Sequence, residues 1–166
     1  MLHPGQPSVL FAPDQPHRPV DRRHLIDVAV ALTERGLPVV FVSTHLVEAG
    51  VDVSFDRVFR DFAPLDSIVQ AAGRCNRSFD RDTGLVTAWL LEPPAGREHT
   101  PSASVYDHGG NSLTKLTALA LADVYDGDPM PESTVTRTAV ESYFDRLDAR
   151  GVGNPEYVDH VDKANA

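Results

Sequence analysis

The sequence predicts an α/β fold, in which a parallel β-sheet is flanked by helices, and three observations point to it. Short apolar runs rich in β-branched residues, such as PVVFVST at 38–44, are typical of strands buried on both faces of a sheet. Amphipathic helical patterns lie between these runs, and this alternation is the pattern of layered α/β folds. Two more helical patterns follow near the C-terminus, beyond the last predicted strand.

The first half of the chain predicts a strand, a helix and a second strand. A proline-rich start contains one strand-like run, SVLFA at 8–12. A helix is expected from Pro19, with Asp21 as its cap, until Gly36 ends it. Its apolar stripe consists of Leu25, Ile26, Val28, Ala29 and Leu32. The run PVVFVST then forms the next strand.

The second half of the predicted sheet repeats this order. A short strand is expected around 57–60, a helix begins at Pro64, and LVTAWLLE at 85–92 forms another strand. The inner stripe of the helix consists of Leu65, Ile68, Val69 and Ala72. Helices are also expected at 112–125 and 133–149. Because a doubly wound lobe with fewer than five strands would leave a buried type of sheet edge uncovered, the lobe is expected to be incomplete.

Composition excludes several classes of function. The chain has 166 residues, the size of one domain, and its 24 acidic against 15 basic residues give a formal charge of -9. That charge disfavours broad electrostatic attraction to nucleic acid, so any such contact is expected to be local. A single cysteine excludes an intramolecular disulfide and a multi-cysteine zinc site, and the histidines show no metal-ligand spacing. No apolar run reaches the ~18 residues of a membrane span, and a cytoplasmic location is expected.

One stretch, VQAAGRCNR at 69–77, carries two arginines three residues apart directly after the helix that begins at Pro64. A guanidinium is always charged, is planar and donates two parallel hydrogen bonds, so it is suited to phosphate oxygens. Taken alone, two such arginines are more often a solvated face. Cys75 between them is expected to be a small packing residue rather than a nucleophile.

The pattern Q-x-x-G-R-x-x-R resembles motif VI of superfamily-two helicases, and STHLVEAGVDVSF at 43–55 resembles their motif V. Two segments, APLDSIVQAAGRCNR at 63–77 and RPVDRRHLIDVA at 18–29, resemble the corresponding segments of the CRISPR-associated helicase-nuclease of type I systems. The resemblance covers roughly 18–92. It implies a second RecA-like helicase lobe followed by extra C-terminal helices.

The resemblance also implies roles for individual residues. Arg74 and Arg77 would face the phosphates of ATP as catalytic arginine fingers. The other residues implied in nucleotide binding are Gln70, Gly73, Gly50 and Asp52, the last through the ribose hydroxyls or through coupling to the finger pair. The residues implied to contact single-stranded DNA are Ser43, Thr44 and Glu48.

The family's phosphate-binding glycine loop, magnesium-holding acidic motif and nuclease domain have no counterpart in these residues. The resemblance therefore implies that the Mg²⁺ of ATP is held by a first lobe, in cis or in trans, and that this chain alone does not hydrolyse ATP. The expected partners are single-stranded DNA, that first lobe with its nuclease domain, and a CRISPR surveillance complex.

Five regions are expected: an irregular lead-in at 1–17, the partial lobe at 18–92, a loop at 93–111, a helical region at 112–150 and a flexible tail at 151–166. Two other functions stay open from the sequence. A non-catalytic remnant or interaction module would pair with a partner lobe without any effect of nucleotide. The corresponding lobe of an RNA helicase would differ by its preference for RNA strands.

Overall fold

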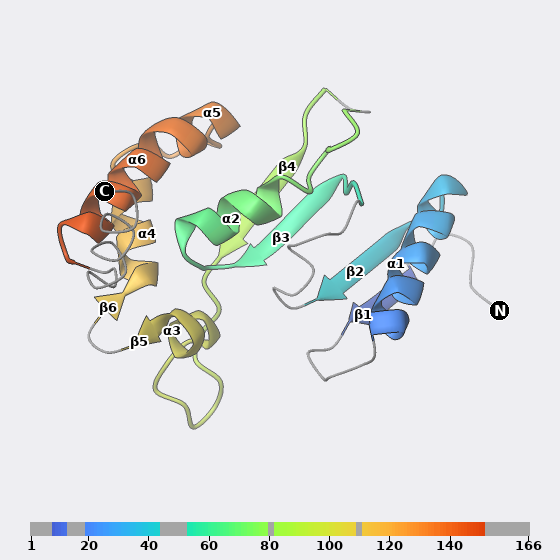
Figure 1. Ribbon diagram of the computed structural model, residues 1–166, viewed down its shortest axis with the longest axis horizontal. Coiled ribbons are helices and arrows are strands. Elements are labelled where there is room, and N and C mark those ends of the chain that lie inside the picture. The colour runs from blue at the N-terminus through green and yellow to red at the C-terminus, as the bar shows by residue number, and fades with distance from the viewer. Residues whose placement is uncertain (1–7, 13–18, 44–52, 80–81, 109–110, 152–166) are drawn as a thin grey trace, which may run out of the picture.

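A computed structural model describes residues 8–12, 19–43, 53–79, 82–108 and 111–151. Its elements follow the predicted order through two strand–helix–strand units and then a set of C-terminal helices (Figure 1).

The first unit joins β1 (Ser8–Ala12), α1 (Pro19–Glu34) and β2 (Val39–Ser43). β1 and β2 pair in parallel with Ser8 opposite Val39, as two strands joined by a crossover helix must. The chain leaves α1 through Gly36, whose φ of 69° lies in the left-handed region that glycine adopts without steric cost. The predicted helix end at Gly36 is therefore confirmed.

The second unit joins β3 (Arg57–Asp61), α2 (Leu65–Ala72) and β4 (Leu85–Trp89). Its strands also pair in parallel, from Arg57 opposite Leu85 to Asp61 opposite Trp89. α2 begins directly after Pro64, as predicted.

Parallel pairing with flanking helices is thus confirmed, but β1 to β4 form two separate pairs and not one continuous sheet among the described residues (Figure 1). An aromatic contact joins them: the ring centroids of Phe41 on β2 and Phe55, just before β3, lie 6.1 Å apart.

The C-terminal region contains more structure than the sequence predicts. Within the expected loop lie the helix α3 (Pro101–Tyr106) and a small antiparallel pair, β5 (Asp107–His108) with β6 (Asn111–Ser112). The predicted helix at 112–125 is α4 (Leu113–Ala122). The predicted helix at 133–149 forms as α5 (Glu132–Thr134), a π-helical segment η2 (Val135–Ala139) and α6 (Val140–Asp148).

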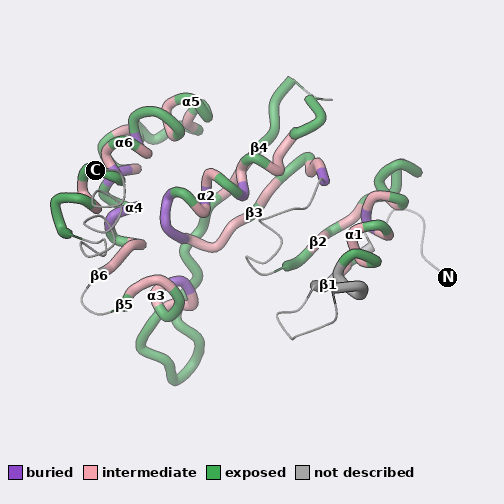
Figure 2. The backbone as a smooth tube through the Cα atoms, viewed as in Figure 1, coloured by how far each residue is buried: buried purple, intermediate pink, exposed green. Residues whose placement is uncertain are grey.

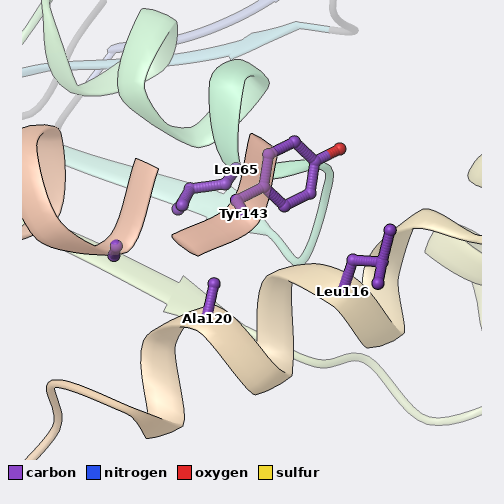
Figure 3. Packing of buried hydrophobic residues seen from close by; sticks show 5 residues of the cluster. Leu65, Leu116, Ala120 and Tyr143 are labelled. Carbon is purple, nitrogen blue, oxygen red and sulfur yellow. The ribbon is translucent and has the colours of Figure 1, made fainter. Parts of the chain in front are cut away.

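The main hydrophobic core lies between α2 and these C-terminal helices. Its buried members are Leu65, Leu116, Ala120, Ala139 and Tyr143, and Figure 3 shows how four of them converge from α2, α4 and α6. Burial is accordingly greatest at the start of α2 and along the facing sides of α4 and α6, whereas β2 and the segment after β4 are largely exposed (Figure 2). Within the described part of the chain, no helix combines the length and apolarity needed to cross a bilayer.

Candidate functional site

The helix α2 positions the sequence-predicted arginine motif. Its inner face is buried through Leu65, Ile68 and Ala71, which leaves Gln70 exposed on the opposite side. The helix ends at Gly73, whose φ of -61° is ordinary right-handed backbone. A Cβ added there would meet only the Gln70 carbonyl oxygen at 3.5 Å and that of Val69 at 3.7 Å. The local backbone does not require glycine at this position, so its role in close approach to a nucleotide stays a prediction.

The two arginines lie on the turn that follows α2, and this segment is defined here as the arginine turn, 73–79. The amide of Arg74 donates to the Ala71 carbonyl at 3.0 Å. Asn76 then reverses the chain with a φ of 49°, a conformation for which asparagine is enriched. Arg74 is half-buried and Arg77 is exposed. The turn therefore presents one guanidinium near the protein body and one toward solvent.

The arginine turn is hydrogen-bonded to Ser54 and Phe55, the last two residues of the predicted motif V segment. The Phe55 amide donates to the Arg74 carbonyl at 2.9 Å, and the Asn76 amide donates to the Phe55 carbonyl at 2.7 Å. The Ser78 amide donates to the Ser54 hydroxyl at 3.2 Å. The two bonds of Phe55 form a parallel bridge between Phe55 and Cys75. Ser54 and Phe55 were not singled out from the sequence, because only the tertiary pairing reveals their contact with the turn.

The Cys75 side chain of the turn packs against the backbone near the starts of β3 and β4. Its thiol lies 3.5 Å from the Leu85 carbonyl oxygen and 3.6 Å from that of Asp56. Burial raises the pKa of the Cys75 thiol, which disfavours the thiolate and agrees with a packing role. Gly84 makes room for this side chain, because a Cβ added there would lie 2.6 Å from the Cys75 Sγ.

The structure brings together four of the predicted site residues, Gln70, Gly73, Arg74 and Arg77, on α2 and its turn. Ser43 is the exposed last residue of β2. The remaining predicted site residues, Thr44, Glu48, Gly50 and Asp52, lie outside the described residues.

The donor groups of this site fit phosphate contact rather than metal binding. From Gln70 to Phe79 the chain carries two arginines and no carboxylate. No group of three or more histidine, cysteine, aspartate or glutamate side chains suited to a metal ion occurs among the described residues. The chemistry available here is therefore the binding and orientation of an anion, to which guanidinium groups donate paired hydrogen bonds.

Two parallel strand–helix–strand units flanked by helices form an α/β fold of the RecA-like helicase type. The fold supports this: a T. fusca structure described as Cas3-ADP superposes with a TM-score of 0.65 at 21% identity, covering 86% of this chain and 17% of that one. The T. fusca structure described as Cas3-ATP gives a TM-score of 0.58 at 22% identity, covering 88% and 19% of the two chains.

Sequence comparison identifies the family. Residues 14–80 match the family model described as CRISPR-associated nuclease/helicase Cas3, C-terminal. The CRISPR-associated nuclease/helicase Cas3 of Haloferax volcanii is 38% identical over 174 aligned positions, which cover 98% of this chain and 19% of that protein. The protein of the same description from Methanothermobacter thermautotrophicus is 43% identical over 113 positions, covering 67% of this chain and 12% of that protein.

The chain therefore belongs to the Cas3 nuclease/helicase family and corresponds to a C-terminal part of it. It spans about a fifth of the length of the Haloferax relative.

Proposed function

We propose that this chain is the second motor lobe of an ATP-dependent DNA helicase of CRISPR defence, and that it supplies Arg74 and Arg77 to ATP held by a first lobe. In the assembled protein, closure of the two lobes on ATP would bring these guanidinium groups to the phosphates, where they stabilise the charge that spreads over the transferred group. The Mg²⁺ of the nucleotide would be held by the first lobe.

One observation carries this proposal: the arginine turn is hydrogen-bonded through its backbone to residues 54–55, the end of the predicted motif V segment. A movement of the turn toward a nucleotide would therefore pull on Ser54 and Phe55, which lie just before β3. Such a link is what a motor needs in order to convert the state of the nucleotide into a change of grip on a strand. The predicted strand contacts at Ser43, Thr44 and Glu48 belong to this part of the proposal.

The first prediction concerns Arg77. The 166-residue chain is mixed with a polypeptide that carries a Cas3 first lobe, and DNA-stimulated ATP hydrolysis is measured. Activity is expected only in the mixture. Arg77→Ala is expected to lower it by about a thousandfold, since arginine fingers contribute on this scale. The fold should stay intact, because an exposed side chain contributes little to the free energy of unfolding.

The matched control is Arg97→Ala, which removes an exposed arginine far along the chain from the turn. Its ATP hydrolysis should equal that of the wild-type chain. Full activity of Arg77→Ala, or an equal loss in both variants, contradicts the arginine-finger assignment.

A second candidate function is a non-catalytic interaction module, and an exposed apolar face on β3 and β4 favours it. The rings of Phe59 and Trp89 stack at 5.3 Å and are 55% and 46% exposed, and Leu85, at the other end of β4, is 45% exposed. Apolar surface of this kind commonly marks a protein interface. This function predicts that the first lobe binds with the same affinity with and without ATP, and that the mixture hydrolyses none.

A further inference from the structure

Phe79 is the last residue of the arginine turn, and its ring is exposed to solvent. The side chain is 88% exposed, more than any other large apolar side chain of the described residues. Its φ of 55° lies in the left-handed region, which is rare for a bulky residue with a Cβ. Water contact of the ring and an unfavourable backbone conformation both cost free energy, and residues held in this way concentrate at ligand-binding positions.

The backbone around Phe79 is held by hydrogen bonds on both sides of the turn. The Phe79 amide donates to the Asn76 carbonyl at 3.0 Å, and the preceding Ser78 amide donates to the Ser54 hydroxyl. The Asn76 amide in turn donates to the Phe55 carbonyl. The exposed ring therefore projects from a turn whose backbone is bonded to Ser54 and Phe55, just before β3.

The neighbours of Phe79 indicate which ligand would cover the ring. Arg74 and Arg77 precede it by five and two residues, and no carboxylate lies between Gln70 and Phe79. Cations that bind phosphate next to an exposed aromatic face form the combination that proteins use for nucleotides and single strands, in which the base stacks on the ring. A purely aliphatic partner would not need the two guanidinium groups.

We propose that Phe79 is a stacking platform for a nucleobase whose phosphates are bound by the arginine turn. The proposal rests on the proposed function, because it takes the arginines as the phosphate-binding groups. The base belongs either to ATP or to the DNA strand, since both present the same flat aromatic face, and the experiment separates these sources.

The experiment is saturation-transfer NMR on the 166-residue chain, with ATP in one arm and single-stranded oligothymidylate in the other. Base protons of one ligand are expected to receive saturation from the wild-type protein. Phe79→Ala should remove this signal and raise Kd about tenfold or more, as expected for loss of one stacked base. Phe79→Tyr should restore it. Saturation of adenine protons assigns the platform to ATP, and saturation of thymine protons assigns it to the strand.

The matched control is Tyr125→Ala, because Tyr125 is an aromatic residue with 57% of its surface exposed in the segment after α4. Its ligand signals should equal those of the wild type. Equal base saturation for wild type and Phe79→Ala, or no base saturation in either arm, overturns the proposal. Retained ATP hydrolysis in Arg77→Ala would instead contradict the assignment of Arg77 as an arginine finger. The NMR experiment separates that failure from a failure of the stacking proposal, because it reports on the base and not on the phosphates.

Discussion

At the residue scale, the arginine turn depends on a glycine at position 84, where there is no room for a side chain. Gly84 lies against Cys75 and Asn76, the two residues between the arginines, so closely that an added Cβ would lie 2.6 Å from one and 3.0 Å from the other. Separations this short force atoms to move. Since the Cys75 thiol lies against the backbone carbonyls of Asp56 and Leu85, and the nearby Asn76 atom is a Cβ, we expect the turn itself to shift.

The second prediction is that Gly84→Ala displaces the arginine turn. The free energy of unfolding should fall by about 1–3 kcal/mol, the usual cost of overpacking, as measured by urea denaturation. Gly73→Ala provides the contrast, because Gly73 has a φ of -61° and an added Cβ would make only ordinary van der Waals contacts, at 3.5 and 3.7 Å. That variant should be unchanged or more stable by about 0.4–1 kcal/mol. Equal stability of the two variants would show that the close approach at Gly84 is relaxed at no cost.

At the scale of elements, the C-terminal helices anchor the helix that carries the site. Leu65, the first residue of α2, is fully buried against the core formed with Leu116 of α4 and Tyr143 of α6 (Figure 3). Burial, and secondarily the Asp66 carboxylate, raises the pKa of Tyr143 to about 12, so its phenol stays neutral near pH 7. A polar link joins α4 to α6, in which Arg146 and Ser142 donate to the Asp123 carboxylate at 2.7 and 2.8 Å.

The third prediction tests this anchor with two neighbouring aromatic residues of α6. Tyr143 is 3% exposed and Phe144 is 46% exposed. Tyr143→Ala should lower the free energy of unfolding by about 3–5 kcal/mol, the range for truncation of a buried aromatic side chain. Phe144→Ala should cost much less. Denaturant midpoints at neutral pH measure both, and similar losses would mean that Tyr143 does not hold α6 against α2.

At the scale of the whole molecule, burial is unevenly distributed. In the unit of β1, α1 and β2, Ala29 is the one buried residue among those whose side chains are described. In the second unit, β3 and β4 are supported by α2, which is itself packed on the C-terminal helices (Figure 2). Because local stability follows the number of buried apolar contacts, the two units should open with different free energies.

The fourth prediction is that amide hydrogen exchange separates the two units. Amides of β2 (Val39–Ser43) should exchange about tenfold or more faster than those of β3 (Arg57–Asp61), since the former open without disturbing the main core. Exchange at neutral pH followed by mass spectrometry of overlapping peptides resolves both strands. Equal protection of β2 and β3 would instead indicate one cooperative unit.

Local features of the sequence predicted the helices and strands of the lobe with small errors at their ends. Pro64 precedes α2 and Gly36 ends α1, as expected from proline geometry and the left-handed conformation of glycine. The segment 93–111 was less predictable. α3 has six residues, mostly small or polar, and begins with Pro101 after a Thr100 cap, so it has no apolar periodicity to detect. A hydrogen bond anchors α3 to β3: the Arg60 guanidinium donates to the Tyr106 hydroxyl at 2.9 Å. These two residues are far apart in the chain, so local sequence does not reveal the contact.

The sequence by itself determined the order of the elements, the arginine motif at 70–77 and the family resemblance, because periodicity, turn chemistry and motif spacing are local properties of the chain. Only the tertiary structure decided that the strands pair as two separate units, that α2 packs on the C-terminal helices, and that the arginine turn is bonded to Ser54 and Phe55. These features depend on contacts between distant residues, whose pairing and register are selected by packing and by the hydrogen-bond demands of the buried backbone.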